Sequence, residues 1–119
     1  MRVFFGVAVA FCSLGFAPQA LASPTGNTLF EQCTRERDSA TYWYDDATCT
    51  AYIQGFVEGA TSFQELWPKE RPKAICLPAK ATAGQIRDVV VKYLNQHPER
   101  RHLPAMMSIL TATVAAFPC

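Results

Sequence analysis

The chain has 119 residues, of which half are hydrophobic and 18% are charged, with eight Pro and five Cys. This length fits a single domain, and the apolar fraction excludes a wholly disordered chain. The formal net charge of +1 excludes a strongly basic nucleic-acid-binding protein, and the sequence has no phosphate-loop, dinucleotide-binding or zinc-protease motif.

The first 22 residues have the pattern of a secretory signal peptide. Arg2 precedes an apolar run over residues 3–16, and the Ala-Leu-Ala tripeptide at 20–22 matches a cleavage site with small residues. Pro18 ends the run before it reaches the roughly 20 residues that a membrane-spanning helix needs. We therefore expect cleavage after this tripeptide, leaving a periplasmic or secreted domain, residues 23–119, with no membrane span.

The mature domain keeps four cysteines, Cys33, Cys49, Cys76 and Cys119. An even number of cysteines in a small exported chain predicts two disulfides, and three pairings are open. We favour Cys33–Cys49 with Cys76–Cys119, because each bridge would then join neighbouring elements. No Cys-x-x-Cys spacing occurs, which argues against a redox motif or a zinc site.

The clearest predicted helix begins after Asp45-Asp46, which we interpret as its N-cap, and ends before Pro68. Apolar residues recur along it with steps of three and four, which indicates one buried stripe. Gly55 and Gly59 share a face of this helix. They fit either a close approach of another helix or partner, or tolerated surface glycines. The predicted stripe consists of Cys49, Tyr52, Ile53, Phe56, Val57, Ala60, Phe63 and Trp67.

Three further helices are expected. A short one covers residues 28–37, and another follows the capping-box pattern of Thr82 and Gln85 and ends by residue 96. The last covers residues 104–117, with a proline suited to its first turn. Since no segment alternates like a strand, the sequence predicts an all-α, four- to five-helix bundle stapled by two disulfides.

Two segments outside these helices are candidates for partner binding. Tyr42, Trp43 and Tyr44 lie between the first two predicted helices, where they either cover the core or form an interface anchor. The Pro-rich segment 68–78 carries Lys69, Arg71 and Lys73. It is either a solvated linker or a stiff loop that loses little entropy when it binds a partner.

No combination of residues calls for catalysis. The two histidines, His97 and His102, lie in one predicted turn. A catalytic Cys–His pair would need a free thiol, and the four mature cysteines are expected to be oxidised. The sequence therefore predicts a protein that is not an enzyme, with no cofactor and no metal. A stress chaperone that exposes apolar surface in acid is the alternative function.

Several segments together resemble one family of exported proteins. They are Gly26-Asn27, the run CTAYIQGFVEG at 49–59, Cys76-Leu77-Pro78, the run QIRDVVVKYL at 85–94, and AAFPC at 115–119. The ordered set is similar to the Rap/Tai family of type VI secretion amidase immunity proteins. The resemblance covers nearly all of residues 23–119, although none of the segments is specific alone.

The resemblance implies an α-helical fold with disulfides, a periplasmic location, and binding that occludes an effector that cleaves peptide bonds in peptidoglycan. It also implies a non-enzymatic protein and allows a homodimer. Contact residues do not carry over, because such loops vary with the cognate effector. Tyr42, Trp43, Tyr44, Lys69, Arg71 and Lys73 are therefore proposed from their own chemistry.

Overall fold

A computed structural model describes residues 22–119, so the predicted signal peptide lies outside the described residues apart from Ala22. Within that range the chain forms four α-helices, one 3-10 turn and no β-strand, which confirms the all-α prediction. Each α-helix contacts the other three. The elements are α1 (Gly26–Cys33), α2 (Tyr42–Glu65), α3 (Ala83–Gln96), η1 (Pro98–Arg100) and α4 (Ala105–Ala116).

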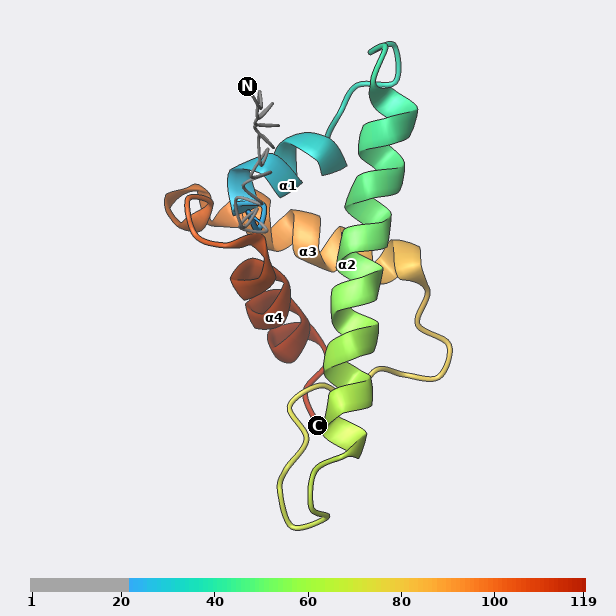
Figure 1. Cartoon of the computed structure of the whole chain (residues 1–119), viewed down its shortest axis with the longest axis vertical. Helices are drawn as coiled ribbons and strands as arrows, with labels where there is room; N and C mark the ends of the chain where they lie inside the picture. Colours follow the sequence, from blue (N-terminus) through green and yellow to red (C-terminus); the bar gives the residue numbers. More distant parts are fainter. Residues whose placement is uncertain (1–21) are drawn as a thin grey trace, which may run out of the picture.

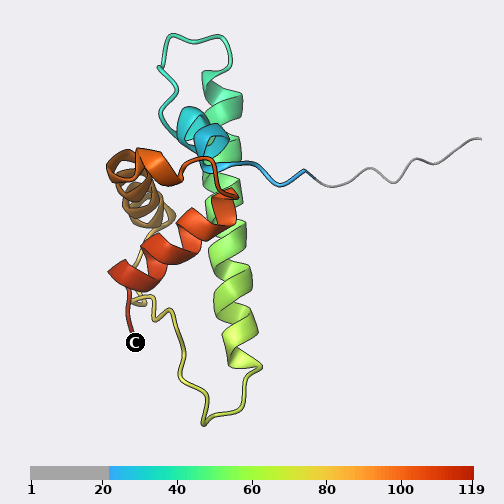
Figure 2. The same ribbon diagram turned by 90° about the vertical axis from the view of Figure 1, so that its left-hand side faces the viewer.

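The longest helix, α2, forms the axis of the molecule (Figure 1). α1 packs against the first half of α2, while α3 and α4 cross it further along, and all three lie on one side of α2 (Figure 2). At 1.5 Å per residue, the 24 residues of α2 span about 36 Å. Both ends of α2 therefore extend to the margins of the bundle.

The core forms where the four helices meet. Leu29, Ile53, Leu94 and Ile109 come from α1, α2, α3 and α4 respectively, and each is almost completely buried. Burying such side chains removes apolar surface from water and is the main stabilising contribution to a domain of this size. The bundle thus has one core shared by all of its helices.

Both predicted disulfides are confirmed. Cys33–Cys49 joins α1 to α2 and is buried, whereas Cys76–Cys119 joins the segment after α2 to the segment after α4 and is exposed. The two bridges differ in exposure, so a dissolved reductant reaches the second more readily.

The start of the described chain is fixed against the turn between α3 and α4. The Gly26 N–H donates to the Leu103 carbonyl at 2.9 Å, and the Asn27 N–H donates to the Arg101 carbonyl at 2.7 Å. A Cβ on Gly26 would lie 2.9 Å from that same Arg101 oxygen, closer than side chains approach. Glycine is therefore required at this position by close packing.

The last two helices lie within a residue of their predicted bounds, whereas the first was predicted over residues 28–37 and is found at Gly26–Cys33, and α2 differs at its start. The capping box at the start of α3 is confirmed, since Thr82 accepts from the Gln85 N–H and the Gln85 side chain accepts from the Thr82 N–H. The interpretation of Asp45-Asp46 as an N-cap is wrong, because α2 begins three residues earlier, at Tyr42. Both aspartates instead pair with arginines of neighbouring segments.

Candidate partner-binding surfaces

The three aromatic residues of the first candidate surface, which we call the aromatic trio (Tyr42, Trp43 and Tyr44), form the first turn of α2. The prediction that these three residues lie between two helices is wrong, since α2 extends through them. Trp43 is 80% exposed and Tyr44 is 71% exposed, so neither covers the core. The half-buried Tyr42 ring meets the Trp43 ring edge-on, with centroids 5.0 Å apart.

An ion-pair network fixes the turn that carries the trio. The buried Asp45 carboxylate accepts from the Thr41 hydroxyl at 2.7 Å and from Arg35 Nε, also at 2.7 Å. The Thr41 hydroxyl and the Arg35 guanidinium hold the pKa of the Asp45 carboxyl below its usual value, against the effect of desolvation. Arg35 also pairs with Glu31 of α1 at 2.9 Å. The network therefore ties the first turn of α2 to α1.

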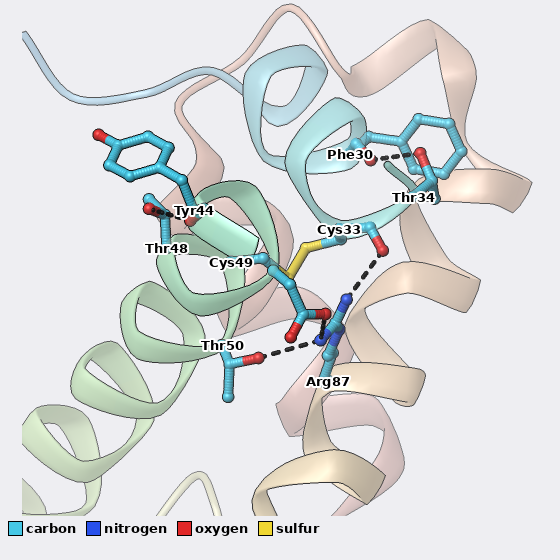
Figure 3. Close-up of a disulfide and its surroundings, with 9 residues drawn as sticks. Phe30, Cys33, Thr34, Tyr44, Thr48, Cys49, Thr50 and Arg87 are labelled. Carbon is cyan, nitrogen blue, oxygen red and sulfur yellow. Dashed lines mark hydrogen bonds and ion pairs between the residues drawn. A yellow bond between two sulfur atoms is a disulfide. The ribbon is translucent and has the colours of Figure 1, made fainter. Parts of the chain in front are cut away.

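A second network lies beside the buried disulfide. Arg87 of α3 donates to Asp46 at 2.6 Å, to the Thr50 hydroxyl at 3.1 Å and to the Cys33 carbonyl at 3.0 Å. Figure 3 shows this guanidinium reaching from α3 toward the Cys33–Cys49 bridge between α1 and α2. Arg87 thus links α1, α2 and α3 at the end of the bundle that carries the aromatic trio.

The second candidate surface, the basic loop (residues 68–75), begins just beyond the end of α2. A buried side chain on α2, Gln64, holds the returning half of the loop. Its Oε1 accepts from the N–H groups of Ala74 and Ile75 at 2.7 and 2.8 Å, and its Nε2 donates to the Ile75 carbonyl at 3.0 Å. Prolines at 68 and 72 restrict the backbone further. The loop is therefore ordered without a partner.

The basic residues of the loop differ in their contacts. Lys73 pairs with Glu65 at 2.6 Å, and the Arg71 guanidinium lies 4.7 Å from the centroid of the Trp67 ring. Lys69 is exposed, with no ion pair in residues 22–119. Arg71 and Lys69 thus keep donors that are available to a partner.

The structure does not bring the two candidate surfaces together. The aromatic trio lies at the first turn of α2 and the basic loop begins beyond its last turn, at opposite ends of the molecule (Figure 1). Between them, Gly55 and Gly59 are exposed, with no atom within 4 Å of an added Cβ. Within the described chain they are surface glycines and receive no neighbouring helix.

Sequence reasoning missed two apolar side chains beside the basic loop. Phe63, which we predicted to be part of the buried stripe, is 60% exposed, and Leu66 is 80% exposed. Gln64 takes the inward position, seven residues after the buried Val57. Continuing the helical period from Val57 would have placed residue 64 in the core, but the apolar pattern did not indicate this because residue 64 is polar.

Among the described residues no group of three or more His, Cys, Asp or Glu side chains could hold a metal ion. None of the described helices is long and apolar enough to cross a membrane.

The remaining surface includes an apolar side of α4. The exposed apolar side chains at and before α4 are Leu103, Met106, Met107 and Leu110.

The fold defines a small helical protein with two disulfides. A family model, described as Rap1a immunity proteins, matches residues 25–119. The chain belongs to the Rap1a immunity protein family, which makes it an immunity protein directed against a protein effector. No curated protein and no solved structure matches it.

Proposed function

We propose that this protein protects its cell by binding and occluding a peptidoglycan amidase effector of a type VI secretion system. The observation that supports this proposal is the ordered basic loop beside exposed Phe63 and Leu66. Arginine and aromatic residues are enriched at interface anchors, and a loop fixed before binding loses little entropy on association. The protein acts stoichiometrically, without turnover.

We propose that Lys69, Arg71 and Lys73 contact the effector together with the aromatic trio. Because the two surfaces lie at opposite ends of α2, one effector molecule touching both must extend about 36 Å along it. Such a footprint is compatible with a standard interface of about 800 Å² per partner. The basic loop is the part that enters the active-site cleft, since it extends beyond the helical body (Figure 1).

Export is part of the proposal. Cleavage after Ala22 would release a mature domain, residues 23–119, whose first turn of α1 follows within four residues. The disulfides support a location in an oxidising compartment, because such bonds persist there and are rare in the cytosol. The periplasm is therefore the place where the protein meets its effector.

We also propose that two copies pair through the apolar side of α4. Met107 is 49% exposed and Leu110 36% exposed on a helix whose other side faces the core. A two-fold dimer buries the same patch on both copies, so a small apolar patch on one chain is doubled at the centre of the interface. Light scattering should give twice the mass of one chain for the native protein, and Met107→Glu should return the mass to that of one chain.

Affinity capture tests the proposed function. A tag inserted after residue 22 of the full-length gene lets the host export and oxidise the protein before purification from the envelope fraction. The proposal predicts recovery of one hydrolase in a fixed ratio to the protein, and loss of peptidoglycan hydrolysis by that enzyme when the protein is added. If no hydrolase is recovered, or the recovered one stays active, the proposal is wrong.

A further inference from the structure

A pocket opens between the end of α2, the basic loop and the exposed disulfide. Its volume is about 610 Å³. Of the charged side chains around it three are basic and one is acidic, so it attracts negative charge. The lining residues are Gln64, Glu65, Trp67, Pro68, Lys69, Arg71, Pro72, Lys73, Cys76 and Cys119.

The single acidic side chain of this pocket already pairs with one of its three cations. The Lys73 ammonium donates to Glu65 Oε1 at 2.6 Å, and Gln64 Oε1 accepts from two loop N–H groups. Lys69 and Arg71 are left without an ion pair in residues 22–119. An incoming partner therefore meets an excess of donors.

Two donors of the pocket, on Arg71 and Trp67, lack acceptors within residues 22–119. The Arg71 guanidinium is stacked against Trp67 and makes no hydrogen bond or ion pair within residues 22–119. Stacking occupies the face of a guanidinium and leaves its N–H edge free to grip a carboxylate with two parallel hydrogen bonds. The Trp67 Nε1 is buried and has no acceptor within the same residues.

We infer that this pocket binds a carboxylate side chain, Asp or Glu, presented by an acidic segment of the protein partner. Arg71 holds the carboxylate, Lys69 adds charge at the rim, and the Trp67 ring packs against the methylene groups of the acidic residue. This inference rests on the proposed function, because it names the chemistry of the effector segment that meets the basic loop. It also makes a claim that can be tested without the effector.

The two tryptophans provide a direct readout. Trp67 lines the pocket, whereas Trp43 lies at the other end of α2, so the two indole N–H signals in a ¹⁵N-resolved NMR spectrum report on the site and on an internal control. The probe is a capped five-residue peptide with alternating Ala and Glu. The matched control peptide has Gln in place of Glu. A charge-assisted pair in an open pocket gives millimolar affinity, so the titration extends to about 50 mM.

The expected result is a saturable shift of the Trp67 indole signal with the Glu peptide, no such shift with the Gln peptide, and an unmoved Trp43 signal. Arg71→Gln should reduce the affinity about tenfold or more, and Arg71→Lys should have a smaller effect because it keeps the charge but loses the paired hydrogen bonds. Arg100→Gln, a change of the exposed last residue of η1, should leave the affinity unchanged.

Three outcomes would overturn the inference. One is an absence of saturable shift at Trp67 in a folded protein. Another is an equal response to the Glu and Gln peptides, which would show that charge is not recognised. The third is an equal response to acetate at the same carboxylate concentration, which would make the pocket a small-anion site. If a captured hydrolase is still fully inhibited by the Arg71→Gln protein, the inference is wrong although the proposed function holds.

Discussion

Gln64 and Ile75 are joined by two hydrogen bonds between one side chain and one backbone unit. The Gln64 amide nitrogen donates to the Ile75 carbonyl at 3.0 Å, and its oxygen accepts from the Ile75 N–H at 2.8 Å. Both residues are buried, so water does not compete for these bonds. This pair converts a Pro-rich segment into a fixed loop.

Replacing Gln64 by Leu should therefore release the basic loop. The change keeps a similar volume but leaves the N–H groups of Ala74 and Ile75 without their acceptor, which costs about 1–3 kcal/mol. Urea denaturation should show this loss, and hydrogen exchange should accelerate at both amides. Gln54→Leu is the matched control, since Gln54 is exposed on the same helix and its side chain hydrogen-bonds only to Glu58 among the described residues. Equal effects of the two changes would contradict this role for Gln64.

Glycine substitutions should have opposite effects at two places. Gly26→Ala puts a Cβ within 2.9 Å of the Arg101 carbonyl, which already accepts from the Asn27 N–H, and should lower the free energy of unfolding by about 1–3 kcal/mol. Gly59→Ala meets open space inside a helix and should raise it by about 0.4–1 kcal/mol. Thermal denaturation of the two variants should shift the midpoint down and up respectively; a stabilising Gly26→Ala would contradict the packing at Arg101.

Removing the Arg87 side chain should loosen the trio end of the bundle. Arg87→Leu leaves Asp46 and the Cys33 carbonyl without their donor and should cost about 1–3 kcal/mol in unfolding free energy. Arg100→Leu is the control, because its nitrogen is 3.9 Å from Glu99 on an exposed surface and its loss should cost less than about 0.5 kcal/mol. Denaturation curves that coincide for the two variants would show that the Arg87 contacts do not stabilise the bundle.

Acid should weaken the link between α1 and α2. The pKa of the Asp45 carboxyl is lower in the folded protein than its usual value, so the folded state binds fewer protons there than the unfolded chain. Its stabilising contribution is complete above the usual pKa and is lost as pH falls toward the folded value.

The free energy of unfolding should therefore decline from about pH 5 to about pH 3, and Asp45→Asn should flatten that decline. Asp88→Asn, on the exposed side of α3, is the control. An unchanged pH profile for Asp45→Asn would contradict the assignment. Binding of an aggregating client by the acid-exposed protein would favour the chaperone alternative.

The two disulfides should be reduced in a fixed order. Cys76 and Cys119 are exposed, whereas Cys49 is fully buried with Cys33 beside it in the core. A mild dithiol should open Cys76–Cys119 first, and timed alkylation followed by peptide mass spectrometry should label that pair before the other. Simultaneous labelling of all four cysteines would mean that the core bridge is as accessible as the outer one.

Helical periodicity, cap motifs and cysteine count were sufficient to predict the all-α fold, the capping box at Thr82 and the presence of two disulfides. The favoured pairing, which joins neighbouring elements, is also confirmed. They failed where a tertiary contact decides the local structure. Arg35 pairs with Asp45 and lets α2 begin at Tyr42, and no local pattern reveals a partner ten residues away. Gln64 likewise reads as a surface residue until the returning loop is known.

The sequence separates the candidate contact residues by a helix but does not show how exposed they are or what they contact. The sequence shows an aromatic run and a basic run before and after one helix, and the length of that helix sets the distance between them. The exposure of Trp43 and Tyr44 decides against their covering the core, a choice that the sequence left open. The pocket beside Trp67 depends on the Cys76–Cys119 bridge and the Gln64 contacts together.

The most direct test of the central claim is a titration of the captured hydrolase with this protein, with release of peptidoglycan fragments as the readout. If the protein occludes the active site, activity should fall in proportion to added protein and reach zero near one equivalent, and Arg71→Glu and Lys73→Glu should move the curve to higher concentrations. Full hydrolase activity in a large excess of folded, oxidised protein would contradict it.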